Sequence, residues 1–283
     1  MTEAMALLDR AIAELVPAPF ASCLVDGCFE KGKDLTAGGA KYNFTGVQFM
    51  GLANVADSLA AVKKLVFDEA KVSSRELAGA LASDYSGYEP MRQMLLKRAP
   101  KYGNDNDEVD GIARDLVKHF ADELAEYKNY RGGQFQMGIF SVAFHIVMGA
   151  FTGATPDGRK MSEALANGIT PQTGMASNGP TSIARSAAKL GQTEVSNGNT
   201  LILRFHPRSV EPPKLMALIR TYFALGGMQV QFNMVDTETL LDAQAHPEKH
   251  RDLIVRIAGY SVLFTSLSKK AQDEIISRTV CSL

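Results

Sequence analysis

A short segment near the C-terminus, Arg256-Ile257-Ala258-Gly259-Tyr260-Ser261, contains a glycine with distinctive potential chemistry. Loss of a hydrogen atom from the Cα of Gly259 would leave a carbon radical, which the adjacent amide nitrogen and carbonyl group both stabilise when all three are coplanar. A Cβ would crowd that plane, and glycine also adopts backbone angles that are closed to other residues. An isolated Ala-Gly-Tyr is more often an ordinary turn, so the flanking sequence must decide between the two interpretations.

The flanking sequence continues the pattern on both sides of Gly259. Upstream lie Gln-Val-Gln-Phe-Asn at 229–233 and Asp-Ala-Gln-Ala-His-Pro-Glu at 242–248, and downstream lies Gln-Asp-Glu-Ile-Ile-Ser-Arg-Thr at 272–279. This run resembles the glycyl radical domain of the pyruvate formate-lyase superfamily. The resemblance implies that Gly259 stores an unpaired electron. It also implies a radical loop formed with the neighbouring residues Arg256, Ala258, Tyr260 and Ser261.

The resemblance to this superfamily extends over almost the whole chain. Several segments look like parts of the later half of the family's ten-stranded α/β barrel, in the family order. These segments lie at 38–46, 54–66, 154–160 and 178–182. The expected fold is therefore α/β: the C-terminal part of that barrel with its surrounding helices, followed by the glycyl radical domain. We expect the barrel part at residues 1–150 and the glycyl radical domain at residues 151–283.

The spacing of apolar residues predicts the elements that carry these motifs. Helices are expected at 2–16, 53–69, 73–82, 109–129 and 212–226. Strands are expected at 134–147, 199–206 and 228–235. Asp57-Ser58 is the candidate start of the second helix, and Ser73 or Ser74 is the candidate N-cap of the third. The apolar run that begins at Gln134 predicts a buried strand feeding the turn at 155–159.

The three cysteines, Cys23, Cys28 and Cys281, are too few and too irregularly spaced for a disulfide scaffold or for a zinc or iron–sulfur site, so no metal is expected. Residues 27–30 nevertheless spell Gly-Cys-Phe-Glu, the pattern around the family's substrate-activating cysteine. The sequence that follows, through Gly38-Gly39, instead resembles the helix and turn found after that catalytic loop. Cys28 is therefore interpreted as a structural thiol, with a thiyl-forming catalyst as the alternative.

The resemblance also implies a cofactor and partners. An S-adenosylmethionine-dependent iron–sulfur activating enzyme would install the glycyl radical on Gly259, and this chain would bind no further cofactor. An N-terminal half would carry the catalytic cysteine, and the complete protein would form a homo-oligomer. In the family, the glycyl radical converts that cysteine into a thiyl, which takes a hydrogen atom from a small-molecule substrate.

The match favours the branch of dehydratases, C–N and C–S lyases, aryl decarboxylases and fumarate-adding enzymes. We expect a C-terminal portion or subunit of a lyase that breaks a C–O, C–N or C–S bond by elimination, with aryl-acid decarboxylation or fumarate addition as alternatives. A non-catalytic module that repairs a damaged radical domain is a further alternative, although such a module needs only the final domain. An inactive product of a broken gene is the last alternative.

Family strands equivalent to 42–51 and 134–145 line the barrel, which suggests a substrate pocket. The candidate pocket residues are Phe44, Gln48, Phe49, Gln136, Ile139, Ser141 and Phe144. Phe49 stands where many relatives have glycine, so it either fills the cavity or packs in the core. His145, on the apolar run, is expected to be a core histidine with satisfied hydrogen bonds rather than a catalyst.

Composition sets only broad limits on function. A chain of 283 residues that is 46% hydrophobic can bury a sizeable core. A net charge of −1 gives no electrostatic reason to expect nucleic acid or an anionic membrane as a partner. The N-terminus lacks the basic start and apolar core of a signal peptide, and no apolar run is long enough to span a bilayer. The expected location is the cytoplasm.

Overall fold

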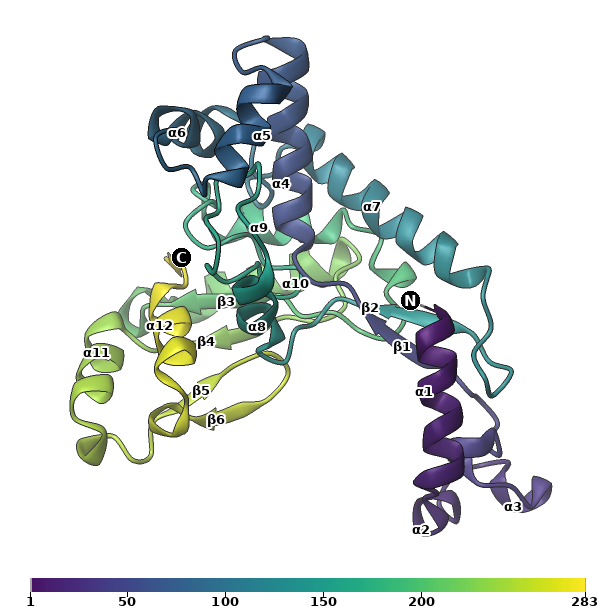
Figure 1. Ribbon diagram of the computed structural model, residues 1–283. Coiled ribbons are helices and arrows are strands. Elements are labelled where there is room, and N and C mark those ends of the chain that lie inside the picture. The colour runs from purple at the N-terminus through teal and green to yellow at the C-terminus, as the bar shows by residue number, and fades with distance from the viewer. Residues whose placement is uncertain (1, 283) are drawn as a thin grey trace.

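The computed structural model describes residues 2–282, in which short strands are flanked by helices (Figure 1). The helices are α1 (Thr2–Leu15), α2 (Pro19–Ser22), α3 (Cys28–Lys31), α4 (Leu52–Val62), α5 (Ser74–Ala82), α6 (Glu89–Arg98), α7 (Asp107–Ala125), α8 (Phe144–Phe151), α9 (Gly179–Ala188), α10 (Pro212–Ala224), α11 (Thr237–Ala245) and α12 (Lys269–Ser277). The strands are β1 (Thr45–Gln48), β2 (Phe135–Gly138), β3 (Ile202–Phe205), β4 (Gln231–Asn233), β5 (Ile254–Arg256), β6 (Ser261–Leu263) and β7 (Val280–Cys281). This mixture confirms the predicted α/β class.

Two parallel sheets form the centre of the molecule. β1 pairs with β2, while β3 lies between β4 and β7. A parallel bridge between Ile139 and Asn199 joins the end of β2 to the chain that leads into β3. The two sheets therefore follow one another edge to edge. β5 and β6 form a separate antiparallel hairpin.

Three apolar clusters hold the elements together. The largest joins α4 and α7 to the buried face of the parallel strands and to α9 and α10, with Leu52, Val109 and Met137 among its members. A second cluster packs α5 and α6 against the end of α4, which one turn of π-helix at 63–68 prolongs. A third joins α11 and α12 to the hairpin through residues such as Ile275. Figure 1 shows α1 to α3 projecting away from this assembly as a separate lobe.

Local sequence signals explain where several helices begin and end. Ser73 accepts a hydrogen bond from the Glu76 N–H over 3.2 Å, and the Glu76 carboxylate accepts one from the Ser73 N–H over 2.9 Å. This reciprocal pair is a capping box, and it confirms the predicted start of α5. At the end of α10, Gly226 adopts a φ of +98°, which only glycine reaches without strain. The predicted helix at 212–226 is thereby confirmed.

The single strand predicted at 134–147 is wrong in its second half. β2 ends at Gly138, and the residues from Phe144 onward form helix α8. Between them, Val142 and Ala143 adopt φ values of +44° and +69°, which turn the chain before the helix begins. A short run of apolar residues fits a buried strand and a buried helix equally well, and tertiary packing decided between them.

The predicted helix start at Asp57 is also wrong. α4 begins earlier, at Leu52, after Gly51 in the left-handed conformation. Asp57 lies inside the helix and is fully buried, where its carboxylate accepts a hydrogen bond from the Tyr102 N–H over 2.7 Å. Burial raises the pKa of Asp57 to about 7, against the opposing effect of the Lys101 charge. The hydrogen bond between Tyr102 and Asp57 ties α4 to the segment before α7.

No helix within residues 2–282 is long and apolar enough to cross a lipid bilayer.

Candidate radical site

Gly259 lies at the tip of the hairpin formed by β5 and β6. The two strands pair directly opposite one another, and residues 257–260 close the turn with a hydrogen bond of 3.0 Å from the Ile257 N–H to the Tyr260 carbonyl. Gly259 adopts a φ of +85°, in the left-handed region where a Cβ is unfavourable. The turn itself therefore favours glycine at this position.

The tip of the loop is accessible from outside the described chain. Gly259 is exposed, and apart from its chain neighbours no heavy atom of residues 2–282 lies within 4 Å of the position that a Cβ would occupy. Ala258, immediately before it, is only 3% exposed and belongs to the third apolar cluster. Tyr260, immediately after it, is 38% exposed. The loop is thus anchored on one side, while Gly259 itself stays exposed.

Two side chains of β4 hold the hairpin from one side. The Asn233 carboxamide accepts a hydrogen bond from the Arg256 N–H over 2.7 Å and donates one to the Arg256 carbonyl over 2.8 Å. The Gln231 Oε1 accepts from the Arg256 Nε over 2.8 Å and from the Gly259 N–H over 3.2 Å. Arg256 also donates to the Ser261 hydroxyl across the hairpin, over 3.1 Å. β4 therefore fixes both the first strand of the hairpin and its tip.

Arg278, immediately after α12, holds the carbonyl groups that precede Gly259. Its Nη1 donates to the Arg256 carbonyl over 3.0 Å, and its Nη2 donates to the Ile257 carbonyl over 3.4 Å. Glu274 pairs with the Arg278 guanidinium at 2.8 Å, and the two side chains are 9% and 8% exposed. Burial raises the pKa of Glu274, but the Arg278 charge and then His145 outweigh it and lower the pKa to about 2. Glu274 is therefore ionised at neutral pH.

His145 on α8 extends this buried network toward the parallel sheets. Its Nε2 lies 3.3 Å from Glu274 Oε1, an ion-pair distance without hydrogen-bond alignment. Its Nδ1 lies 2.9 Å from the Ser141 hydroxyl, which donates to the Asn167 Oδ1 over 2.6 Å. The Asn167 Nδ2 donates in turn to the Ile257 carbonyl over 3.4 Å. His145 is buried in the core, as predicted, but its Nε2 has no hydrogen-bond partner among residues 2–282, so the expectation of satisfied hydrogen bonds is wrong for that atom. Two routes link His145 to the loop that contains Gly259, one through Glu274 and Arg278 and one through Ser141 and Asn167.

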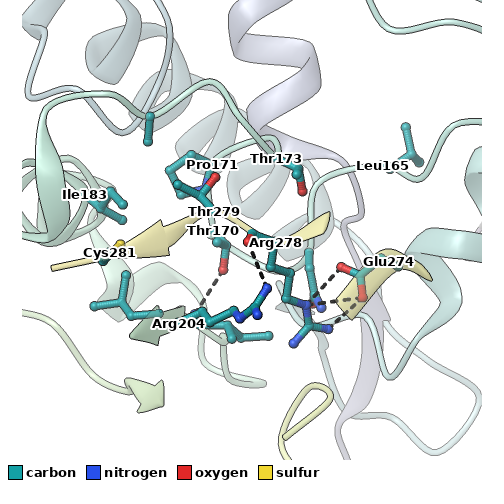
Figure 2. Close-up of a pocket in the computed structure, with 14 residues that line it drawn as sticks. Leu165, Thr170, Pro171, Thr173, Ile183, Arg204, Glu274, Arg278, Thr279 and Cys281 are labelled. Carbon is teal, nitrogen blue, oxygen red and sulfur yellow. Dashed lines mark hydrogen bonds and ion pairs between the residues drawn. The ribbon is translucent and has the colours of Figure 1, made fainter. Parts of the chain in front are cut away.

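A small cavity lies behind this network, between the end of α12, β3 and the loop at 165–176 (Figure 2). Its volume is about 40 Å³, room for no more than a few water molecules. Arg204 and Arg278 both border it, and Figure 2 shows Arg278 directed toward Glu274. Arg204 donates to the Ile276 carbonyl over 2.8 Å, so the C-terminal end of α12 compensates its buried charge. A cavity of this size cannot hold an organic substrate.

The predicted pocket residues are a different set from those that line this cavity. Gln48 and Gln136 share one face of the β1–β2 pair, opposite the face that buries Val47 and Met137. They are the two polar candidates that the sheet brings to the same side. Their role in substrate binding stays a prediction.

The remaining pocket candidates occupy unlike environments. The Phe49 ring lies 5.1 Å from the Phe120 ring, centroid to centroid, and packs against the largest apolar cluster. Ile139 is fully buried, and Ser141 belongs to the network of His145. Phe44 and Phe144 are 45% and 52% exposed. Their contact with substrate stays a prediction.

The cysteines lie away from Gly259 or are buried. Cys28 is the first residue of α3 and is 4% exposed, and Figure 1 places α3 at the opposite end of the molecule from β5 and β6. Cys23 is exposed, whereas Cys281 on β7 is buried, and burial raises its pKa to about 11. The side chains of residues 2–282 include no group of three or more His, Cys, Asp or Glu arranged to hold a metal ion.

The polar side chains that hold the loop were not predicted as functional residues. Gln231, Asn233, Glu274 and Arg278 lie within the motifs that carry the resemblance, but their types alone do not indicate what they contact. One signal was available, because strand alternation places Gln231 and Asn233 on the same face of β4. Asn167 lies on a loop far from the motif and has no comparable signal.

Two family models match this chain. The family model described as pyruvate formate lyase-like matches residues 1–149, and the model described as glycine radical matches residues 165–265, which contain the hairpin and Gly259. The first match covers more than half of the chain. The chain therefore belongs to the pyruvate formate lyase-like family, a family of glycyl radical enzymes whose matched members include dehydratases, a sulfite-lyase and a decarboxylase.

Individual relatives and solved structures match nearly all of this chain. A probable dehydratase of Escherichia coli is 43% identical over 96% of the chain and 35% of its own length. The trans-4-hydroxy-L-proline dehydratase of Clostridioides difficile is 38% identical over 98% of the chain and 36% of its own length. A glycerol-bound glycerol dehydratase from Clostridium butyricum superposes with a TM-score of 0.95 at 46% identity, over 98% of this chain and 36% of that one. The chain thus spans about 35% of the length of the curated relatives it matches.

Proposed function

We propose that this chain is the radical-storing portion of a cytoplasmic glycyl radical lyase. Gly259 carries the radical, and a cysteine outside this chain forms the thiyl that attacks a small substrate. The observation that carries the proposal is the hairpin tip: a left-handed glycine, held by hydrogen bonds from two sides, whose Cα is open to an external partner.

The proposed reaction is a series of hydrogen-atom transfers. An S-adenosylmethionine-dependent activating enzyme transfers one hydrogen atom from the Cα of Gly259 to a radical that it generates from S-adenosylmethionine. The Gly259 radical takes a hydrogen atom from the external cysteine thiol, which restores the glycine and leaves a thiyl. The thiyl takes a hydrogen atom from substrate, and the reverse transfers restore the thiol and the glycyl radical after product forms. This chain contributes the radical store and the hydrogen bonds that hold the loop still.

Exposed apolar side chains support a larger assembly. Phe20, Phe67 and Phe151 are 81%, 74% and 84% exposed, and a partner that covered them would remove this apolar surface from water. We propose that an N-terminal portion carrying the catalytic cysteine covers such surfaces, and that the complete protein forms a homo-oligomer. A repair module would need only the glycyl radical domain. The family match over residues 1–149 therefore favours a lyase portion.

Elimination is the preferred reaction because the first relatives named above are dehydratases. Both are 38% identical or more over nearly the whole chain. Decarboxylation of an aryl acid is the second candidate, because an indoleacetate decarboxylase of Tractidigestivibacter scatoligenes matches at 32% identity. Fumarate addition stays a further alternative from the sequence resemblance.

Electron paramagnetic resonance of the anaerobically activated protein tests the proposal. Activation with the cognate activating enzyme should give a doublet that collapses when glycine is α-deuterated, and Gly259→Ala should abolish the signal. The structure predicts that this variant folds. The open space around Gly259 accepts a methyl group, and the left-handed φ adds only about 1–2 kcal/mol of strain.

Gly226→Ala is the matched control. Gly226 also has a positive φ, +98°, and open space where a Cβ would lie, so the substitution imposes comparable backbone strain away from the hairpin. It should leave the doublet unchanged. An undiminished doublet in Gly259→Ala would remove Gly259 from the mechanism.

A further inference from the structure

Gln231 makes a contact that distinguishes it from the other side chains around the loop. Its Oε1 accepts the Gly259 N–H itself, over 3.2 Å, and the Arg256 Nε over 2.8 Å. Asn233 and Arg278 instead bind the backbone of residues that precede Gly259. Gln231 therefore acts directly on the amide whose nitrogen would share the unpaired electron.

The surroundings of Gln231 indicate that its oxygen is the functional end. The side chain lies at the start of β4 and the residue is 6% exposed. Its Nε2 is buried without a hydrogen-bond partner among residues 2–282. A buried donor without a partner is unfavourable, and an apolar side chain of similar size would avoid that cost. The two hydrogen bonds accepted by Oε1 are the compensating gain.

The hydrogen bond from the Gly259 N–H to Gln231 has a chemical consequence if Gly259 carries the radical. The amide nitrogen stabilises the Cα radical only while its lone pair is parallel to the half-filled orbital. An acceptor on the N–H fixes the orientation of that amide plane and increases the electron density on nitrogen. The Arg256 guanidinium, bound to the same Oε1 and to the Ser261 hydroxyl, holds the Gln231 oxygen in place.

We propose that Gln231 is a positioning residue that orients the Gly259 amide through its N–H and thereby tunes the glycyl radical. This proposal rests on the proposed function for its radical consequence, whereas the N–H hydrogen bond exists in the protein before activation. The two parts can therefore be measured separately.

The first measurement is hydrogen exchange at the Gly259 amide in the protein before activation, resolved by fragmentation mass spectrometry. Gln231→Leu removes the acceptor and should speed exchange by about threefold to tenfold, the range expected for loss of one hydrogen bond. Gln231→Glu keeps an acceptor beside Arg256 and should restore the slow exchange. Equal exchange in the wild-type protein and in Gln231→Leu would overturn the proposal.

The second measurement is the coupling of the exchangeable amide proton to the radical, by electron–nuclear double resonance in H2O and D2O. Gln231→Leu should change this coupling, and Gln231→Glu should keep it near the wild-type value. Asn233→Leu is the matched control, because it frees the Arg256 backbone without touching the Gly259 N–H. It should loosen the hairpin and leave the coupling unchanged.

The outcomes separate the two proposals. An unchanged amide-proton coupling in Gln231→Leu, or an equal change in Asn233→Leu, would refute a tuning role for Gln231. If the wild-type protein forms no doublet, the proposed function fails, while exchange at the Gly259 amide still decides whether Gln231 holds that amide.

Discussion

Glu274→Gln should weaken the attachment of the radical loop while changing side-chain size very little. The substitution removes the negative charge that pairs with Arg278 at 2.8 Å, and Arg278 stays buried. Leaving one partner of a buried ion pair uncompensated typically costs about 3–5 kcal/mol. The pKa supplies a second magnitude, because the difference between 4.5 and about 2 corresponds to about 3 kcal/mol. We expect Glu274→Gln to lower the free energy of local unfolding of α12 and the hairpin by about 3 kcal/mol.

The effect of Glu274→Gln should depend on pH in a defined direction. The folded-state pKa of Glu274 lies below its ordinary value, so its stabilising contribution is fully present above about pH 4.5 and is lost as the pH falls toward 2. By pH 3.5 roughly 1 kcal/mol of that contribution is gone. The glutamine variant cannot titrate at this position. The difference in free energy of local unfolding between the wild-type protein and the variant should therefore shrink as the pH falls from 7 to 3.5.

Hydrogen exchange of peptides from α12 and from residues 250–265 measures this effect in the whole protein. After correction for intrinsic exchange rates, Glu274→Gln should raise exchange on the order of a hundredfold at pH 7. Asp273→Asn is the matched control on the same helix, because Asp273 and its partner Lys269 are 51% and 75% exposed, and exposed pairs contribute little. Equal exchange in the two variants, or a deficit that does not change with pH, would refute the assigned role of the Glu274–Arg278 pair.

Three further predictions concern the cysteines and assembly. Iodoacetamide at pH 8 should alkylate Cys23 and spare Cys281, because burial raises the pKa of Cys281 to about 11. Mass spectrometry of the folded protein measures the labelling, and alkylation of Cys281 would contradict the prediction. Cys28→Ser should leave activity with an N-terminal partner intact, since Cys28 begins α3, which Figure 1 places at the opposite end of the molecule from β5 and β6. Loss of turnover with preserved folding would make Cys28 a catalyst. Purified alone, the chain should scatter light or oligomerise, whereas co-expression with the N-terminal portion should give a soluble complex of fixed stoichiometry. A dispersed monomer with cooperative unfolding would contradict this last prediction.

The sequence by itself determined the family and the local elements with strong signals. The run around Gly259 is contiguous, so no tertiary information was needed to recognise it. The start of α5 after Ser73 and the end of α10 before Gly226 were predictable, because capping and chain reversal depend on the types of a few neighbouring residues. Family membership and an α/β fold followed from those local patterns.

Tertiary structure decided the features that depend on which residues meet across the fold. It made the end of the apolar run a helix at Phe144, and it buried Asp57 within α4. It also brought Gln231 to the Gly259 N–H and Arg278 to the carbonyl groups that precede it. Local propensity does not predict such contacts, because the partners lie 21 to 28 positions apart and meet only when β4, the hairpin and α12 pack together.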